Sequence, residues 1–329
     1  MRKIVYLLLA MMLFCAVTYG GCGGSPDDNF SSSDTGESQT ITDDTDTADD
    51  TDTADDTDTT GGRGGSSGTS SDVVDLSTLT ANYTAQDGET LTGRLIRTVK
   101  ISIADGAAVT LNNITINGYN SERCKWAGLT CEGNAAIVLR GINIVKGFHE
   151  DYSGIYVPEG KTLTIKGGGS LNASSYGWGA GIGGCCFLPC GNIVIARGTI
   201  TADGGYNAAG IGGAQDAGCG DITITGGKIT ATGGNNGAGI GSGFRGGCGN
   251  ITITGGTTTA TGGYFAAGIG SGQKGSCGDI TINDTVKKVT ATRDNSAPNS
   301  VGAGYKGKCG KVIIDGKETG DISKNPFIH

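Results

Sequence analysis

A repeat of 29 residues is the feature that most constrains the fold of this chain. The tetrapeptide Ala-Gly-Ile-Gly occurs four times, and its isoleucines are Ile182, Ile211, Ile240 and Ile269. Each isoleucine is followed eight residues later by a cysteine and then by alternating apolar and polar residues. A fixed period of this length is typical of stacked repeats, because a single unit cannot bury its own apolar face.

Each repeat contains three short alternating segments separated by glycine-bearing turns. Alternation with a period of two indicates β-strands and excludes a helical repeat. The pattern continues less regularly back to Ile101 and forward to Cys309, which corresponds to about eight coils. We therefore predict an all-β fold over residues 72–329, a single-stranded right-handed parallel β-helix (solenoid). Residues 72–98 should cap its first coil and residues 311–329 its last, since an open end would expose unpaired strand edges.

The N-terminus has the features of an export signal. Arg2 and Lys3 precede an apolar run over residues 4–17, which is short for a membrane-spanning helix. Residues 19–22, Tyr-Gly-Gly-Cys, resemble a bacterial lipobox, although Tyr19 stands where leucine is usual and ordinary signal cleavage is the alternative. We expect residues 1–22 to be a signal peptide and Cys22 to be lipidated. The protein would then be exported to the bacterial cell surface or outer membrane and held there by a lipid anchor.

Residues 23–71 predict a disordered linker, rich in Asp and Thr and then in Gly and Ser. The acidity of the chain is concentrated at this end. Residues 1–71 carry 13 acidic and three basic side chains, whereas the rest of the chain carries 19 acidic and 21 basic ones. The repeat region is therefore close to neutral, and no nucleic-acid partner is indicated.

Two kinds of side chain recur at fixed positions of the repeat. The cysteines are Cys190, Cys219, Cys248, Cys277 and Cys309. We favour a ladder of small apolar side chains at a tight corner, and disulfides between neighbouring coils are the alternative. The repeat region holds nine cysteines, an odd number, so complete pairing is impossible. Within one coil, we expect a disulfide between Cys124 and Cys131.

The second ladder is polar and consists of Asn192, Asp221, Asn250 and Asp279. Hydrogen-bonded stacking and turn formation explain it without any function. Calcium bridging between the aspartates is the alternative, but the intervening asparagines lower the charge that such a site needs.

The ionisable residues offer little catalytic equipment, and we predict no catalytic residue. The regular repeats show no facing pair of carboxylates of the kind that glycoside hydrolysis uses. The densest ionisable cluster is His149-Glu150-Asp151. Such a cluster is more often a solvated turn than a metal site, so Glu150 and Asp151 are only weak candidate ligands for a calcium ion. Calcium is the one cofactor that the sequence suggests.

Aromatic residues gather in one kind of segment, the turn before the Ala-Gly-Ile-Gly strand. Stacked coils would place these turns along one edge, where rings could contact the apolar faces of sugars while amides bind their hydroxyl groups. The alternative is that the rings only shield the loops. The candidate carbohydrate-binding residues are Trp126, Tyr152, Tyr176, Trp178, Tyr206, Asn235, Tyr264 and Phe265.

Threonines offer a competing surface. Thr223 and Thr252 occupy one repeat position, and Thr230 and Thr259 another. Such flat Thr-x-Thr arrays are similar to those of ice-binding β-helices, although threonine is also favoured on any exposed strand. We expect the ranks to last two or three coils before Val194 and Asn283 interrupt them.

The repeated motifs Ala-Gly-Ile-Gly, Cys-Gly-Asn-Ile-Thr-Ile-Thr-Gly-Gly and Thr-Ala-Thr-Gly-Gly resemble those of pectin-lyase-like right-handed β-helix proteins of anaerobic bacteria. Residues 159–173 resemble proteins described as carrying a carbohydrate-binding domain. The resemblance covers roughly residues 72–320 and implies binding of a surface polysaccharide or glycan, or adhesion. We expect a non-catalytic carbohydrate-binding surface protein. The alternatives are a polysaccharide lyase or glycoside hydrolase, and a structural adhesin, with ice binding a minor candidate.

Overall fold

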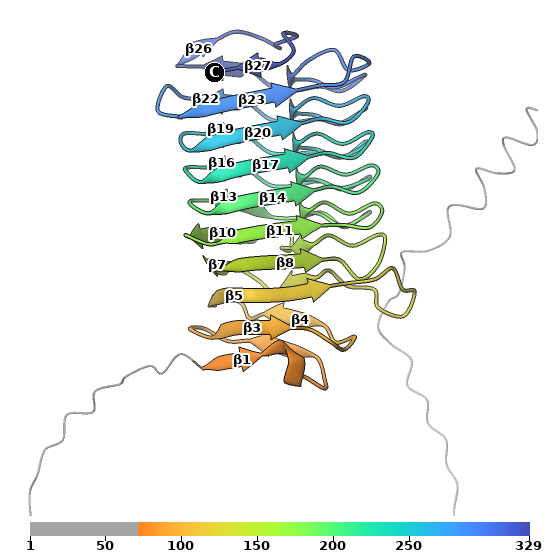
Figure 1. Ribbon diagram of the computed structural model, residues 1–329. Helices are drawn as coiled ribbons and strands as arrows, with labels where there is room; N and C mark the ends of the chain where they lie inside the picture. Colours follow the sequence, from red (N-terminus) through yellow and green to blue (C-terminus); the bar gives the residue numbers. More distant parts are fainter. Residues whose placement is uncertain (1–71) are drawn as a thin grey trace, which may run out of the picture. The chain divides into compact units, whose positions relative to one another are not determined.

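The 29-residue repeat folds as one coil of a parallel β-solenoid. The computed structural model describes residues 72–329, in which most coils give two strands to an 18-stranded sheet and one short strand to a nine-stranded sheet. Figure 1 shows the coils stacked from β1 (Val73–Asp75) to β27 (Phe327–Ile328). The prediction of an all-β parallel solenoid is confirmed. Within the described residues, no helix is long and apolar enough to cross a membrane.

The strands of the large sheet come in pairs, one pair for each regular coil. The pairs are β7 (Ala135–Arg140) with β8 (Ile142–Lys146), β10 (Thr162–Gly167) with β11 (Ser170–Ser174), β13 (Asn192–Ile195) with β14 (Thr199–Asp203), β16 (Ile222–Ile224) with β17 (Lys228–Thr232), β19 (Ile251–Ile253) with β20 (Thr257–Thr261), and β22 (Ile280–Ile282) with β23 (Lys288–Thr292). In the preceding coil, the long strand β5 (Ala108–Asn117) pairs with both β7 and β8.

The short strands form the second sheet behind these pairs. They are β2 (Tyr83–Ala85), β4 (Ile101–Ile103), β6 (Leu129–Cys131), β9 (Ile155–Tyr156), β12 (Ile182–Gly183), β15 (Ile211–Gly212), β18 (Ile240–Gly241), β21 (Ile269–Gly270) and β24 (Val301–Gly302).

The repeat isoleucines form a continuous buried column. Ile182, Ile211, Ile240 and Ile269 are parallel partners in successive coils, and each is fully buried. Their neighbours in the large sheet alternate buried and partly exposed residues, as the period of two requires. The apolar residues of every coil therefore meet in one narrow core that runs the length of the stack.

The ladder of asparagines and aspartates joins the coils by hydrogen bonds. The backbone N–H of Asp221 donates to Asn192 Oδ1 at 2.8 Å, and that of Asn250 donates to Asp221 Oδ1 at 2.7 Å. Asp279 and Lys311 continue the series, with donor–acceptor distances of 2.9 and 2.7 Å. Hydrogen-bonded stacking, which the sequence suggested for this ladder, therefore accounts for its side chains.

The two ends of the stack are built differently. Residues 72–98 contain β1, the 3₁₀ turn η1 (Leu76–Thr78), β2 and β3 (Thr90–Arg94), and their strands already pair with the next coil in the parallel sense. At the other end β26 (Lys317–Glu318) pairs antiparallel with β25 (Val312–Ile314), and β27 with β23. The reversed strands cover the last coil and bury Phe327.

One of the two threonine ranks runs further than the sequence suggested. Thr201, Thr230, Thr259 and Thr290 are in register on four adjacent strands. Val194 and Asn283 lie outside these strands and do not interrupt this rank. Val194 does end the other rank, because it pairs with Thr223, and that rank spans the three coils of Thr223, Thr252 and Thr281.

A buried threonine interrupts the core on the opposite face of the same strands. Thr258 lies in register between Ile229 and Val289, is fully buried, and its Oγ1 has no hydrogen-bond partner among the described residues.

We expect Thr258→Val to raise the free energy of unfolding by about 1–2 kcal/mol, because it removes an unsatisfied buried hydroxyl. Urea unfolding followed by circular dichroism measures the change. The partly exposed Thr259→Val is the control and should stay within about 0.5 kcal/mol, whereas a drop in stability for Thr258→Val would contradict the assignment.

The glycine after each repeat isoleucine allows the coils to approach closely. Gly241 has φ +136°, and a Cβ there would collide with the carbonyl oxygen of Gly270 in the next coil. Gly241→Ala should therefore lower the free energy of unfolding by about 3 kcal/mol or more. Gly218→Ala is the matched control, because a Cβ at Gly218 meets nothing within 4 Å. Equal urea midpoints for the two variants would refute the close packing at Gly241.

Candidate functional site

The turns that carry the predicted sugar-binding residues stack on one another. The backbone N–H of Tyr206 donates to the carbonyl of Gly177, that of Asn236 to Tyr206 at 3.3 Å, and that of Phe265 to Asn235 at 3.2 Å. These bonds join four consecutive coils. We call the turns at residues 176–178, 206–207, 235–236 and 264–265 the aromatic edge.

Two tyrosines present the most exposed rings of this edge. Tyr206 and Tyr264 are each 52% exposed and occupy the same position two coils apart, with the exposed Asn235 between them. Trp178 packs edge-on against Tyr206, with ring centroids 5.5 Å apart, and Phe265 packs edge-on against Tyr264 at 4.5 Å. Trp178 and Phe265 are only partly exposed. Each tyrosine is thus held by a second ring, which limits its rotation.

Tyr176 is exposed but one face of its ring is already occupied. The Lys146 Nζ lies 3.6 Å from the ring centroid, which is a close cation–π contact. A sugar could reach this ring only from the other face or after the lysine has moved.

Trp126 and Tyr152 are less exposed than the two tyrosines of the edge. Trp126 is partly buried against the core and packs on Phe148, with centroids 5.8 Å apart. Its indole N–H is buried without a hydrogen-bond partner in the described part of the chain. Tyr152 is partly buried and contacts the His149 ring edge-on at 5.9 Å. Both rings therefore contact other rings within the irregular early coils.

Tyr305 extends the edge beyond the residues predicted for it. Its ring lies 5.3 Å from that of Phe265, and it is 40% exposed. Tyr305 and Phe244 each follow the buried aliphatic residue of a short strand, Val301 or Ile240, by four positions. The four-residue spacing is visible in the sequence, but Val301 follows Ile269 by 32 residues and not by 29, so the match is easily overlooked.

Asparagines below the rings hold the turns together. The Asn236 side-chain N–H donates to Asn207 Oδ1 at 2.6 Å, and Asn207 donates to Gln215 Oε1 at 2.5 Å. Asn207 is buried, whereas the neighbouring Asn235 is exposed. Adjacent asparagines therefore have separate roles, one inside the turn and one on its surface.

Charged residues flank the aromatic edge at a repeat position with left-handed backbone. Asp216, Arg245, Lys274 and Lys306 have φ between 52° and 56°. Arg245 forms a two-point ion pair with Asp216, with N–O distances of 2.6 and 2.7 Å. Lys274 lies 5.7 Å from the Phe244 ring centroid and Lys306 lies 5.2 Å from that of Tyr305. The last coils thus combine rings with positive charge.

Glu150 and Asp151 belong to the turn at His149. Asn120 contacts Glu150 through its side-chain amide at 3.4 Å, and Asp151 Oδ2 lies 3.4 Å from His149 Nδ1. The imidazole is buried, and its Nε2 lies 3.3 Å from a carboxylate oxygen of Glu122. Among residues 72–329, no group of three or more His, Cys, Asp or Glu side chains is arranged to hold a metal ion.

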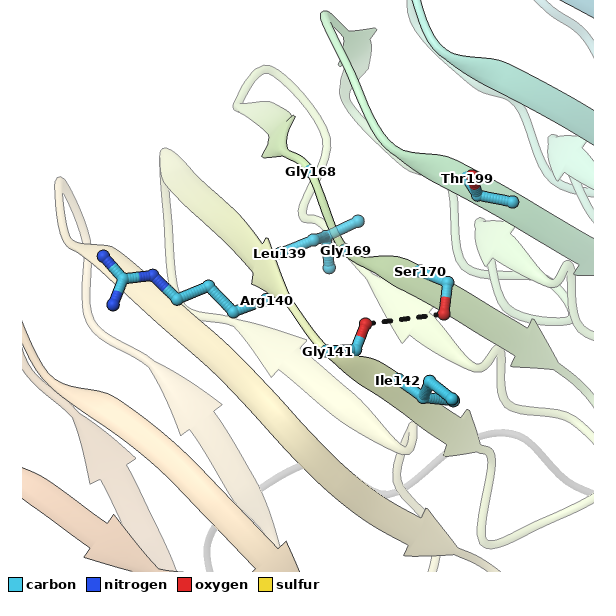
Figure 2. A pocket seen from close by; sticks show the side chains of 8 residues that line it. All are labelled: Leu139, Arg140, Gly141, Ile142, Gly168, Gly169, Ser170 and Thr199. Carbon is cyan, nitrogen blue, oxygen red and sulfur yellow. Dashed lines mark hydrogen bonds between the residues drawn. The ribbon is translucent and has the colours of Figure 1, made fainter.

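Two shallow hollows are lined by residues other than the predicted sugar-binding ones. Figure 2 shows the first around Ile142, Ser170 and Thr199, where Gly168 and Gly169 leave room and Arg140 points away. The second is lined by residues 94–98 with Asn117, Tyr119 and Phe148. None of the eight predicted sugar-binding residues lines either hollow.

The expected disulfide between Cys124 and Cys131 is not formed. Both thiols are free and buried, because Cys131 is a core residue of β6 opposite Ile103. Burial raises the pKa of the Cys131 thiol to about 12, so it stays protonated at neutral pH. The disulfide joins Cys277 to Cys309, one step of the cysteine ladder. Cys22, the predicted lipidation site, lies outside the described residues.

A known protein-family model matches four of the repeats. The model is described as a beta helix repeat, and it matches residues 163–184, 193–215, 222–244 and 251–273. These four segments are similar to that family's repeat, and the fold of the protein is a parallel β-helix. No curated protein and no solved structure matches the chain. The matched segments of the β-helix include Trp178, Tyr206 and Tyr264, but a repeat match specifies architecture and leaves activity to the side chains.

The two adjacent asparagines allow a test of the turn. Asn236→Ala should lower the free energy of unfolding by about 1–2 kcal/mol, because it removes the donor to the buried Asn207 oxygen. Asn235→Ala should change it by less than about 0.5 kcal/mol, because that side chain is exposed. Urea unfolding of the two variants in parallel makes the comparison. A larger loss for Asn235→Ala would contradict the division of roles.

Proposed function

We propose that the β-helix binds a polysaccharide or glycan along the aromatic edge without chemically changing it. The observation that carries the proposal is the pair Tyr206 and Tyr264, two half-exposed rings at one repeat position with Asn235 between them. Coils about 4.8 Å apart separate equivalent atoms of the tyrosines by roughly 10 Å. A chain of linked sugars laid along the stack would meet ring, amide and ring in turn.

The chemistry of these side chains fits sugars. An aromatic face contacts the apolar C–H face of a sugar ring, and an amide both donates to and accepts from hydroxyl groups. Trp178 and Phe265 brace the two tyrosines from the side. Rings that are already ordered lose little conformational freedom on binding, which favours affinity.

The N-terminal residues suggest where such binding would occur. A signal peptide over residues 1–22, lipidation of Cys22 and an acidic linker over residues 23–71 would place the β-helix at some distance from a bacterial membrane. We propose a surface protein of this kind, related in architecture to pectin-lyase-like proteins. Its partners are then the membrane, through the lipid, and a glycan in the surroundings.

Affinity electrophoresis tests the proposal. The protein is run through gels that contain pectin, xylan, glucan or mucin glycans, each with and without EDTA. We expect one polysaccharide to retard it, and the variant Tyr206→Ala/Tyr264→Ala to weaken that binding at least about tenfold. The control variant Thr223→Ala/Thr252→Ala changes two partly exposed strand residues and should bind normally.

Each other outcome has a defined meaning. Loss of retardation in the threonine variant alone would show that the binding surface is formed by the threonine ranks. Loss with EDTA alone would require a metal ion and direct attention to Glu150 and Asp151. Release of shorter saccharides would favour the lyase or hydrolase alternative. No retardation in any gel would refute glycan binding and favour an adhesin with a protein partner.

A further inference from the structure

The five ladder cysteines share one backbone frame. In each coil the glycine after the cysteine donates its N–H to the carbonyl oxygen of the cysteine in the coil before. This bond is 3.0 Å long at all four steps, from Gly220 to Cys190, Gly249 to Cys219, Gly278 to Cys248, and Gly310 to Cys277. Every neighbouring pair of ladder cysteines is therefore held in nearly the same geometry.

The last step shows that this frame accepts a disulfide. Cys277 and Cys309 are bonded with their Cα atoms 4.5 Å apart, within the range that disulfides allow. At the first step the sulfurs of Cys190 and Cys219 lie 2.7 Å apart, about 0.7 Å more than a covalent bond needs. The Cys219 thiol also contacts that of Cys248. The sulfurs of Cys190, Cys219 and Cys248 thus form an unbroken row.

We propose that the ladder is a single exchangeable disulfide unit. Cys190 and Cys219 are free thiols in the structure, and on oxidation they form a second disulfide. The remaining thiol of Cys248 then exchanges with the disulfide on either side. This inference is independent of glycan binding.

Formation of the second disulfide requires an oxidant of the disulfide class, such as oxidised glutathione. The thiols of Cys190 and Cys219 lose two electrons and two protons and gain one S–S bond, while glutathione disulfide is reduced to two thiols. Exchange needs no further oxidant. The Cys248 thiolate attacks Cys277, a Cys248–Cys277 bond forms, the Cys277–Cys309 bond breaks, and Cys309 leaves as a thiolate that takes up a proton.

Neighbour-only pairing restricts where the unpaired thiol can reside. Two disulfides between adjacent members of a five-membered row leave the odd thiol at the first, third or fifth position. Those positions are Cys190, Cys248 and Cys309. Cys219 and Cys277 are paired in every arrangement, so the proposal forbids a free thiol at either of them.

The environment of the ladder affects the rate of exchange. A hydrogen bond to Cys219, together with burial, raises the pKa of the Cys248 thiol well above its usual value. The attacking species is the thiolate, so exchange is slow at neutral pH and accelerates as the pH rises toward that pKa. Cys309 is partly exposed and is the end of the row that soluble thiols can reach.

Trypsin separates the ladder into distinguishable peptides. The five cysteines fall in residues 167–197, 198–228, 246–274, 275–287 and 309–311, and only the first of these peptides contains other cysteines, Cys185 and Cys186. The full chain is incubated for the same fixed time with oxidised glutathione at neutral or alkaline pH. It is then acidified, unfolded in the presence of N-ethylmaleimide, digested without reduction and mapped by mass spectrometry.

We expect one maleimide for the five ladder positions. At neutral pH it should sit mainly on Cys248, with peptide 198–228 linked to 167–197 through Cys190. At alkaline pH part of the label should move to Cys190 and Cys309. The control Cys248→Ser should carry no label on the ladder at either pH and should keep both disulfides.

Specific results would overturn the proposal. Label on both Cys190 and Cys219 would show that the second disulfide does not form. Label on Cys219 or Cys277 would contradict pairing between neighbours. Label that stays on Cys248 at alkaline pH would show that no exchange occurs. Circular dichroism of the wild type and Cys248→Ser establishes that both are folded, so each readout applies to the native ladder.

Discussion

Hydrogen bonding between the backbones of successive coils, in register, is the interaction on which the rest of this structure depends. Parallel strands leave each residue beside its equivalent in the next coil, so a repeat in the sequence becomes a column in space. An isoleucine that recurs becomes a continuous core, and an asparagine or aspartate that recurs becomes a chain of hydrogen bonds. Cysteines that recur become a row of sulfurs, and tyrosines in the turns become a row of rings.

The same constraint separates structure from function along each coil. Most residues that point inward are apolar and fit the residue above. The buried hydroxyl of Thr258 stands out in its column because it has no hydrogen-bond partner among the described residues. Residues in the turns after β14, β17 and β20 have no such requirement once their backbone bonds are made. Position 206 and its equivalents can therefore carry tyrosine or asparagine without cost to the stack, and selection for binding can act there.

The candidate site was partly predictable, and the limits follow from the regularity of the repeat. Tyr206, Asn235 and Tyr264 lie in perfect repeats, so their common position and exposure follow from counting. Trp126 and Tyr152 lie in earlier coils whose length differs, and there the ring turned toward the core or toward His149. Tyr305 was missed because it lies in the turn after a short strand, four positions past Val301, whereas the predicted rings all lie in the turn before that strand. The cation over Tyr176 could not be foreseen, because Lys146 belongs to a different coil.

The sequence by itself determined the architecture: a period of 29 residues with alternating strands admits one arrangement, in which each unit buries its apolar face against the next. It also determined which side chains form columns, because equal spacing places them at equal positions. Only the tertiary structure decided which cysteines pair and which rings remain exposed. Cys124 and Cys131 are close in sequence yet free, whereas Cys277 and Cys309 are 32 residues apart and bonded. Pairing and exposure depend on distances of a few ångströms across the stack, and sequence separation does not measure them.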